Sequence, residues 1–424
     1  MRSTKLAPAL AALVCFVLTS AASAAPAPGS LDPAFSGDGI AVLNLATGPT
    51  SIERFYGIGV QNSTVFATGE ANDRLTLVKL LPGGGVDTSF GGGDGVVRTD
   101  FGHHTYGEGI AFFPDGRIVV VGGADDAHDH SRLAIVVFRP SGRLDRRFSG
   151  DGKLALRPPE GLDEWFGYDA IVQPDGKIIA VGESYSNTGP AQPGNFDVAR
   201  VKRNGELDQS FSDDGMVSVN FLPGDDGAWE GQLMSDGRLV LAGWVYDKSA
   251  NSWDTGLARL RPGGKLDPSF SGDGKLVLDL YKNQNDYAYG LSLRSTGAIV
   301  VGSHTYGTGA TQPRVAQVTK KGTLDTGFGG GDGKAIGFAP NSYFDDLAIN
   351  GSGKIVGVGT EVGTGNMMSF RLTKSGAPDG HYGSNGVMST GMNGGLYEML
   401  LDGQDRPVSV GDFGQDSAAF RLVP

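Results

Sequence analysis

Short runs of β-branched and alternating apolar residues recur along the whole chain, each bounded by Gly, Pro, Asp or Asn. Four such runs follow one another at Gly109–Phe113, Ile118–Val121, Leu133–Arg139 and Lys153–Leu156. Runs of this length that are separated by turn residues are typical of β-strands. We therefore predict four strands in this stretch, labelled A to D in chain order.

This four-strand unit repeats seven times, because two sequence landmarks return with it. One landmark is a polar turn, a β-branched run and a closing glycine, as in Pro114–Gly122. The other is Leu-Asp-x-x-Phe before a Gly-rich Asp-Gly turn, with a period of about 58 residues; its aspartates are Asp32, Asp87, Asp145, Asp208, Asp267, Asp325 and Asp379. Four short strands per period of this length are characteristic of a propeller blade. We predict an all-β fold, a seven-bladed β-propeller with four-stranded antiparallel blades.

The chain begins and ends in the middle of a blade. Ile40–Leu45 follows the first motif as a D-type strand, and Ala418–Val423 ends the chain as a C-type strand with no motif after it. Pairing these two strands removes an exposed sheet edge that would otherwise promote aggregation. We predict a 1+3 closure, in which the N-terminal strand completes the last blade.

The repeated motif residues have structural roles in this interpretation. The motif Phe packs between blades, and the motif Asp accepts the backbone N–H two residues further on. A basic residue stands eight positions before the motif Asp in four copies, at Lys79, Arg200, Arg259 and Arg371, and is expected to pair with it. Arg421 takes the same place in the last, unclosed copy, whereas Val137 and Gln317 break the series. The alternation of Asp267, Ser269, Ser271 and Asp273 is also compatible with a calcium loop.

Composition and charge narrow the possible functions. Glycine supplies 69 of the 424 residues, which disfavours a helix-rich fold. The formal net charge is −12 without a basic cluster, so a nucleic-acid partner is not expected. Residues 1–24 resemble a signal peptide cleaved near Ala24, and they contain the single cysteine, Cys15. We expect residues 25–424 to form one secreted or periplasmic propeller without a membrane span, present as a monomer.

The two landmarks resemble those of the delta-60 repeat family of bacterial exported proteins. The resemblance rests on segments such as Leu31–Gly39 and Pro174–Gly182, and it covers nearly all of the mature chain. It implies a propeller-like fold and export. The family carries no established activity or catalytic residues that could be transferred to this chain.

Candidate ligand-binding residues fall on one face of the predicted propeller. Strand direction alternates within a blade, so the D–A and B–C connections emerge together on what we call the D–A/B–C face. Aromatic residues gather there beside carboxylates, and such surfaces suit stacking on sugar rings or contact with a protein. The candidates are Trp165, Trp229, Trp244, Tyr246, Trp253, Tyr287, Tyr306 and Tyr343. The alternative is that these rings cap the blade interfaces.

Four histidines form a second candidate site on the same face. His103 and His104 precede the first strand of one blade, and His128 and His130 lie in its B–C loop beside Asp126. Imidazole and carboxylate groups together suit a divalent metal such as zinc, copper or nickel. The alternative is a set of solvated loop histidines, and no other cofactor is indicated.

Three functions from different classes remain open. The first is a non-enzymatic exported propeller that binds a glycan, small ligand or protein on the D–A/B–C face. The second is a carbohydrate-active enzyme that uses carboxylates on that face, such as the pairs Asp225/Asp226 and Asp345/Asp346. Neither a Gly-x-Ser-x-Gly nor a His-Glu-x-x-His motif occurs, and no single catalytic residue is assigned. The third is a structural envelope or extracellular protein. An axial funnel lined by carboxylates would favour the enzyme, and exposed tryptophans would favour binding.

Overall fold

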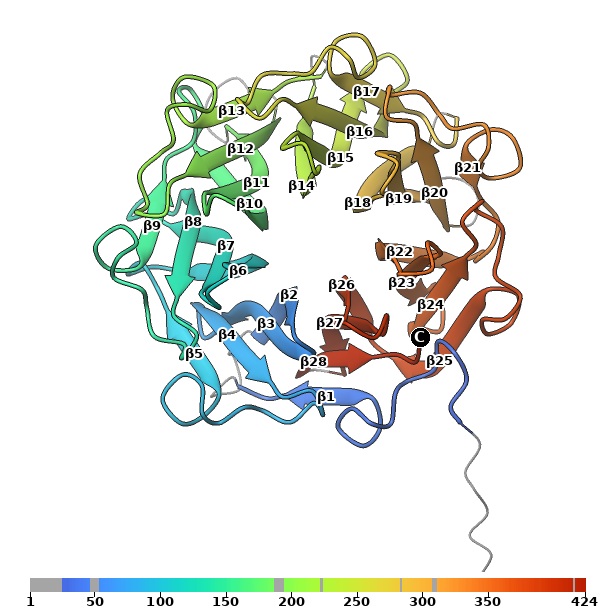
Figure 1. The fold of residues 1–424 in the computed structure, drawn as a ribbon, viewed down its shortest axis with the longest axis horizontal. Helices are drawn as coiled ribbons and strands as arrows, with labels where there is room; N and C mark the ends of the chain where they lie inside the picture. Colours follow the sequence, from blue (N-terminus) through green and yellow to red (C-terminus); the bar gives the residue numbers. More distant parts are fainter. Residues whose placement is uncertain are drawn as a thin grey trace, which may run out of the picture.

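The structure is a computed structural model that describes residues 25–45, 53–186, 194–221, 224–282, 284–306, 311–414 and 416–424. The described residues form 28 strands in seven four-stranded antiparallel sheets. The sheets stand radially around a central axis as the blades of a propeller (Figure 1). The predicted seven-bladed fold is therefore confirmed, whereas the predicted signal peptide at residues 1–24 lies outside the described residues.

Blades are numbered in chain order, and the first-named strand of blades 1 to 6 is the innermost. Blade 1 holds β2 (Glu53–Gln61), β3 (Thr64–Ala71), β4 (Arg74–Leu80) and β5 (Val96–Thr99). Blade 2 holds β6 (Thr105–Phe112), β7 (Ile118–Asp125), β8 (Ser131–Phe138) and β9 (Lys153–Leu156). Blade 3 holds β10 (Glu164–Val172), β11 (Ile178–Tyr185), β12 (Asn195–Val201) and β13 (Met216–Val219).

The remaining blades follow the same order. Blade 4 holds β14 (Asp226–Leu233), β15 (Leu239–Asp247), β16 (Ser252–Leu260) and β17 (Lys275–Leu278). Blade 5 holds β18 (Asn285–Leu293), β19 (Ile299–Tyr306), β20 (Gln312–Val318) and β21 (Lys334–Ala335). Blade 6 holds β22 (Ser342–Ile349), β23 (Ile355–Glu361), β24 (Asn366–Leu372) and β25 (Val387–Asn393). Blade 7 holds β26 (Gly395–Leu401), β27 (Pro407–Phe413), β28 (Asp416–Arg421) and β1 (Ile40–Leu43).

The two ends of the chain close the ring in blade 7. β1 pairs antiparallel with β28, placing Ile40 opposite Phe420 and Leu43 opposite Ser417. A further bridge joins Leu31 to Leu422. The predicted 1+3 closure is confirmed, and the outer edge of β28 is covered by a strand from the other end of the chain (Figure 1).

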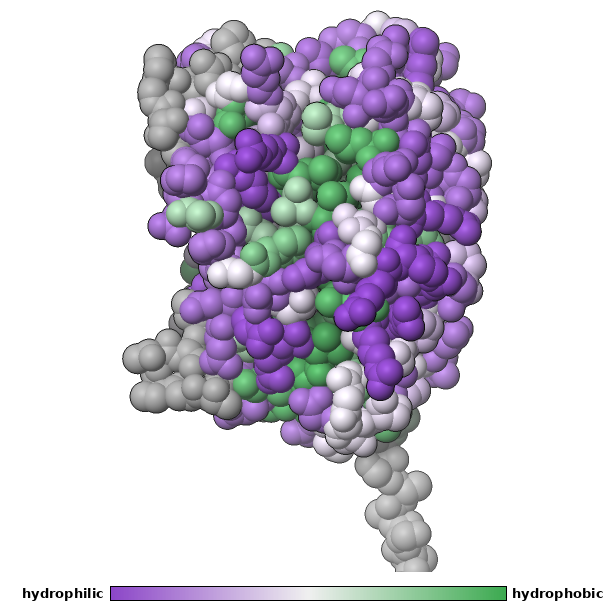
Figure 2. Space-filling view, turned by 90° about the vertical axis from the view of Figure 1, so that its left-hand side faces the viewer, coloured by the Kyte–Doolittle hydropathy of each residue, from purple (hydrophilic) through white to green (hydrophobic). Residues whose placement is uncertain are grey.

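The core consists of apolar layers between and within neighbouring blades. Each motif aromatic is buried there, at 0% or 1% exposure: Phe35, Phe90, Phe148, Phe211, Phe270, Phe328 and Tyr382. Phe35, for example, packs in a cluster with Val410 of blade 7 and Phe55 of blade 1. From the side, a band of apolar residues runs between more polar residues that lie toward the two faces (Figure 2). The predicted role of the motif aromatics as plugs between blades is confirmed.

The motif aspartates form the predicted turns and ion pairs. Each accepts the backbone N–H two residues on, as in Asp32 with Ala34 at 2.9 Å. The basic residue eight positions earlier pairs with the aspartate, as Arg259 does with Asp267 at 2.8 Å. Asp267 also receives Arg238 at 3.1 Å, so basic side chains supply the positive charge at this candidate calcium loop.

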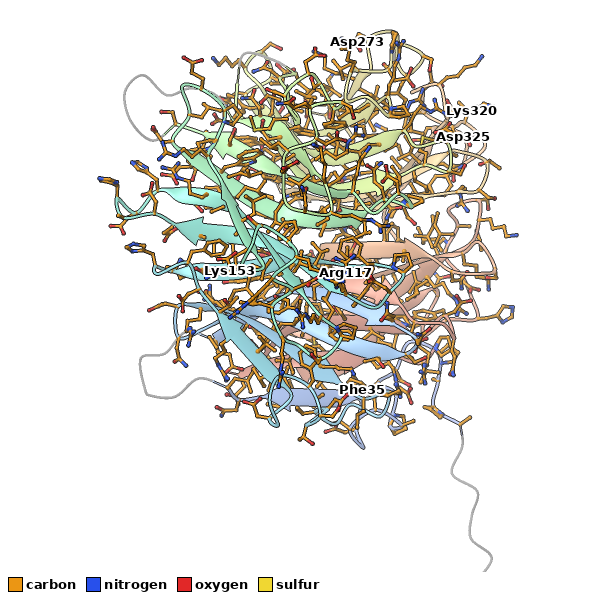
Figure 3. All side chains as sticks on the ribbon, turned by 60° about the vertical axis from the view of Figure 1, so that its left-hand side comes forward. Phe35, Arg117, Lys153, Asp273, Lys320 and Asp325 are labelled. Carbon is orange, nitrogen blue, oxygen red and sulfur yellow. The ribbon has the colours of Figure 1, made fainter. Side chains whose placement is uncertain are left out.

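The motif aspartate also has a side-chain donor in the two blades that lack a basic residue eight positions earlier. Gln317 donates to Asp325 at 2.7 Å in blade 5. In blade 2, Val137 stands eight positions before the motif Asp, and Arg117, which directly precedes β7, donates to Asp145 at 3.3 Å. Arg117 and Asp325 are labelled in Figure 3. The buried aspartate is therefore satisfied by whichever neighbouring donor the blade provides.

Within the part of the chain that the structure describes, no helix has the length and apolar character needed to cross a bilayer.

Candidate functional site

Every innermost strand carries a β-bulge near its start. The register between the first and second strands shifts by one residue at the same place in all seven blades, for example between Gly167 and Asp169. The residue left without a partner in each pairing is Tyr56, Glu108, Tyr168, Trp229, Tyr289, Asp345 or Tyr397. Bulges redirect side chains and often lie next to active sites.

The bulge explains the closing glycine of the second sequence landmark. Gly182 lies opposite Gly167 at the bulge, and a Cβ there would lie 1.8 Å from the carbonyl oxygen of Phe166. The equivalent Cβ at Gly243 would lie 1.9 Å from the carbonyl oxygen of Gly227. A side chain therefore does not fit opposite the bulge without displacing the innermost strand.

The bulges of all seven blades line one pocket on the propeller axis. This axial pocket has a volume of about 300 Å³. Its lining comprises five aromatic and six acidic residues: Tyr56, Glu108, Tyr168, Asp169, Trp229, Glu230, Tyr289, Asp345, Asp346, Tyr397 and Glu398. None of these lining residues is basic, so the pocket combines aromatic faces with unneutralised carboxyl groups.

Four of the six carboxyl groups link neighbouring blades. Each follows a bulge residue and accepts a backbone N–H from the first strand of the next blade. Asp169 accepts from Gly231 at 3.0 Å, and Asp346 accepts from Met399 at 2.8 Å. Glu398 accepts from Ile58 at 2.7 Å, and Glu230 is bonded by the backbone N–H of Leu291.

The other three blades have glycine at this position because the backbones approach too closely for a side chain. A Cβ at Gly57 would lie 1.4 Å from the carbonyl oxygen of Glu108 in blade 2. Glycine also occurs at Gly109 and Gly290. In the blades that follow these two glycines, Asp169 and Asp346 each have a second carboxylate oxygen available. It accepts the backbone N–H of the next residue in the chain at 2.6 Å.

Burial raises the pKa values of the pocket carboxyls. It raises the pKa of Asp169 to about 6 and that of Asp346 to about 8. Burial, reinforced by repulsion from neighbouring carboxylates, raises the pKa of Glu108 and of Glu398 well above the ordinary range. Several of these groups therefore hold protons near neutral pH and can donate as well as accept hydrogen bonds.

A second layer of carboxylates holds the tyrosines of the axial pocket. Tyr168 donates to Glu183 at 2.7 Å, and Tyr56 donates to Glu70 at 2.9 Å. Glu70 in turn contacts the His104 Nε2 at 2.6 Å. These bonds fix the ring orientations, so the aromatic walls of the pocket are preorganised.

An aromatic band leads from the axial pocket toward the D–A/B–C face. Trp229 contacts Tyr168, Trp244 and Tyr289, with ring centroids 4.3, 5.2 and 5.6 Å apart. Tyr287 lies 6.4 Å from Tyr289 and stacks on Trp253 at 5.9 Å. The band ends at Tyr246, which lies 5.0 Å from Trp253. Five of the eight candidate aromatics thus belong to one connected group: Trp229, Trp244, Tyr246, Trp253 and Tyr287.

Trp244 and Trp253 also line a smaller pocket beside this band. Its volume is about 290 Å³, and Glu183, Asp225 and Asp226 contribute to its wall. This side pocket shares Glu183 with the carboxylate layer behind the axial pocket, because Glu183 receives the hydroxyl of Tyr168.

The remaining candidate aromatics are Trp165, Tyr343 and Tyr306. Trp165 is only 1% exposed and packs in the core of blades 2 and 3, which fits the alternative that it caps a blade interface. Tyr343 is half-buried and joins the band through His304, whose ring lies 5.7 Å from that of Tyr343 and 4.7 Å from that of Tyr289. Tyr306 is the last residue of β19, and its side chain lies outside what the structure describes.

The histidines predicted to bind metal are engaged with carboxylates. His104 contacts Glu70 at 2.6 Å and Asp125 at 3.2 Å through its two ring nitrogens. The hydrogen bond to Glu70 raises the pKa of His104 to about 9, which favours the imidazolium form at neutral pH. Asp126 pairs with Arg132.

Of the other three histidines, one contacts a carboxylate and two are exposed to solvent. His130 contacts Glu164 at 3.0 Å, and this hydrogen bond raises its pKa. The side chain of His128 is 82% exposed, and His103 is also exposed. Metal binding by these residues stays a prediction, and any metal would displace the existing carboxylate contacts.

Sequence reasoning missed most of the axial pocket. Glu108, Tyr168, Asp169 and Glu398 were not singled out, because D–A loops of variable length place them at irregular distances from the motif aspartate. A regular spacing does exist relative to the closing glycine. Glu108 precedes Gly122 by 14 positions, as Trp229 precedes Gly243.

Comparisons with known proteins agree with the fold. The family described as "Domain of unknown function (DUF5122) beta-propeller" matches residues 173–211, 235–270 and 294–328. A search of curated proteins found no significant match. The chain is thus similar to a propeller repeat family over parts of blades 3 to 5.

Several solved structures share the architecture at low sequence identity. The polysaccharide lyase Uly1 has 13% identity and a TM-score of 0.50, with 90% of this chain and 92% of that chain covered. A PL25 ulvan lyase has 12% identity and a TM-score of 0.51, with 94% of each chain covered. Drosophila Semaphorin 2a has 10% identity and a TM-score of 0.51, with 87% of this chain and 73% of that chain covered. At these identities the likeness concerns the fold alone.

Proposed function

We propose that this protein is an exported glycan-binding propeller whose axial pocket holds one sugar residue. Aromatic faces pack against the C–H faces of sugar rings, while carboxyl groups bond to their hydroxyls. The axial pocket supplies both along its full circumference. Its volume of about 300 Å³ corresponds to a small ligand.

The observation that carries the proposal is a set of unsatisfied polar atoms on three residues of the pocket wall. Trp229 Nε1 is a buried donor without a partner among the described residues. Glu230 Oε2 and Asp345 Oδ2 are buried oxygens in the same condition. Leaving such groups unpaired costs about 1–3 kcal/mol each. A hydroxyl both accepts and donates, so a sugar suits this mixture better than an ion does.

A glycan array followed by calorimetry tests the proposal. The wild-type protein is expected to retain a defined set of glycans, and Trp229→Ala is expected to weaken their binding by about 10- to 100-fold, in line with loss of a buried aromatic anchor. Trp253→Ala removes a ring of the band outside the axial pocket and is expected to have a smaller effect. Absence of any glycan ligand, or a loss confined to Trp253→Ala, would overturn the assignment to the axial pocket.

A second candidate function is carbohydrate-active catalysis, and one feature of the ring favours it. The bulge residue is aromatic in five blades but is a carboxyl in blades 2 and 6, at Glu108 and Asp345. Blades 1 and 7 separate these two on one side of the ring, and blades 3, 4 and 5 on the other. Two carboxyl groups that face each other across a sugar are the usual arrangement for acid–base attack on a glycosidic bond.

Turnover experiments separate catalysis from binding. An oligosaccharide that binds is incubated with the protein, and new reducing ends are measured. Glu108→Gln and Asp345→Asn keep the size of each side chain, so a catalytic role predicts retained binding with at least a 100-fold loss of turnover. A pure binding protein leaves the oligosaccharide intact in every variant.

A further inference from the structure

Three aspartates meet between blades 4 and 5, and none of them lines the axial pocket. They are Asp254 of β16, Asp279 after the outer strand β17, and Asp286 of the innermost strand β18. One carboxylate oxygen from each lies within 4.8 Å of the others. Asp254 and Asp286 are buried, at 3% and 0% exposure, whereas Asp279 is exposed.

Asp286 is held rigidly by the surrounding backbone. One of its oxygens accepts the N–H groups of Leu280 at 3.0 Å and Tyr281 at 2.8 Å. The other accepts the hydroxyl of Thr305 at 2.5 Å, with Arg314 at 3.9 Å. Asp286 is therefore a fixed, hydrogen-bonded member of the cluster.

Asp254 has no such support. Its Oδ1 is buried and has no hydrogen-bond partner among the described residues. A buried carboxylate oxygen without a donor is costly unless a cation lies beside it.

Two other blades make a complementary contact at the equivalent positions. In blade 1 the residues that correspond to Asp254 and Asp279 are Arg74 and Asp100, which form an ion pair at 2.7 Å. In blade 3 they are Asn195 and Asn220, joined by a hydrogen bond at 3.1 Å. Blade 4 has a carboxylate on both sides of the contact, so the positive partner present in blade 1 is missing.

The lysine that contacts Asp279 bonds to its backbone and not to its carboxylate. Lys334 donates to the backbone carbonyl of Asp279 at 3.0 Å. The equivalent lysines of the preceding blades do the same, Lys153 to Asp100 at 2.7 Å and Lys275 to Asn220 at 3.0 Å. This contact is thus a general feature of the repeat and is no specific response to the extra carboxylate of blade 4.

We propose that Asp254, Asp279 and Asp286 bind one calcium ion, which takes the place of the guanidinium found in blade 1. The ligands are all oxygens, which suits calcium better than zinc or copper. The ion would satisfy Asp254 Oδ1 and join the outer part of blade 4 to the innermost strand of blade 5. Water completes its coordination shell.

Calorimetric titration of the metal-free protein with calcium chloride tests this site. The expected result is one ion per chain and a raised midpoint of thermal unfolding. Asp279→Asn should weaken binding by at least about tenfold, because one charged ligand is lost. Since Asp279 is exposed, this variant is expected to fold normally. Asp213→Asn, at another exposed aspartate, is the matched control and should bind like wild type.

Asp254→Arg provides an independent check because it copies the ion pair of blade 1. It should abolish calcium binding while the unfolding midpoint without calcium stays at or above that of wild type. Glu108→Gln, in the axial pocket, should leave calcium binding unchanged. No calcium binding by wild type, or binding that persists equally in Asp279→Asn and Asp254→Arg, would overturn the proposal.

Discussion

Glu398 of blade 7 accepts the backbone N–H of Ile58 of blade 1 at 2.7 Å, although 340 residues separate them in the chain. The bond joins the innermost strands of blade 7 and blade 1, whereas β1 completes blade 7 at the periphery. Asp169 and Asp346 make the same contact between other blades. The carboxyls of the axial pocket therefore hold the inner strands together as well as lining the site.

Glu398 provides a direct test of this structural role. Glu398→Gln keeps an acceptor oxygen for Ile58 and should unfold within about 1 kcal/mol of wild type at pH 5. Glu398→Ala leaves the buried N–H unpaired and should lower the free energy of unfolding by about 1–3 kcal/mol. Urea denaturation monitored by tryptophan fluorescence measures both. Equal stability of the alanine and glutamine variants would contradict the role assigned to the bond.

Stability should decline as the pH rises above neutrality. Burial raises the pKa of Asp169 to about 6 and of Asp346 to about 8, from the ordinary 3.8. Each group binds its proton more tightly in the folded state, so its contribution is fully present below about pH 4 and is lost as the pH rises through the folded value. His104 acts in the same direction, because its bond to Glu70 raises its pKa from 6.5 to about 9.

Five of the motif aspartates, Asp87 among them, act in the opposite direction at low pH. The hydrogen bond from Lys79 lowers the pKa of Asp87 to about 2, so its contribution is lost as the pH falls from about 4 to 2. Calorimetric scans should therefore show a maximum midpoint between about pH 4 and 6. Glu398→Gln removes one titrating carboxyl, so its stability relative to wild type should improve from pH 5 to 9. A difference that is constant with pH would contradict the raised pKa of Glu398.

The closing ion pair in blade 7 should resemble its counterparts in other blades. Arg421 is 2% exposed and pairs with Asp32 at 2.8 Å. Arg421→Met leaves Asp32 without this partner and should cost about 3–5 kcal/mol of unfolding free energy. Arg421→Gln copies the Gln317–Asp325 pair of blade 5 and should cost less. Chemical denaturation distinguishes them, and an equal loss in both variants would contradict the need for a donor to Asp32.

The repeat made the fold predictable. Seven copies of one motif fixed the number of blades, and the incomplete first and last copies fixed the closure through β1 and β28. The paired roles of Arg259 and Asp267 also followed from spacing, because the two lie in the same blade at a constant separation. Local sequence determines these contacts, so the sequence alone was sufficient to predict them.

The axial pocket was less accessible to prediction. Its residues converge from seven blades, and their position depends on a bulge whose only regular mark is the glycine opposite it, such as Gly182. The aromatic band was partly predicted, since Trp229, Trp244 and Trp253 do form one group. Trp165 had the same apparent pattern, but its ring packs between blades 2 and 3. Chain direction gives the face on which a residue lies, whereas burial depends on packing between blades.

The predicted metal site at the histidines has a testable pH dependence. His104 contacts Glu70 and Asp125 as an imidazolium, so zinc must displace a proton and both contacts. Any zinc affinity that involves this ring should increase as the pH rises toward 9. Titrations with zinc chloride at pH 6, 7.5 and 9 measure this, with His104→Gln as the control. Equal affinity of the two proteins at pH 9 would show that His104 is no ligand.

The most direct test of the proposed function is a crystal structure of the protein with a glycan identified on the array. We predict one sugar ring in the axial pocket, packed against Trp229 and bonded to Glu230 and Asp345. A glycan bound elsewhere, with the axial pocket holding only water, would contradict the account.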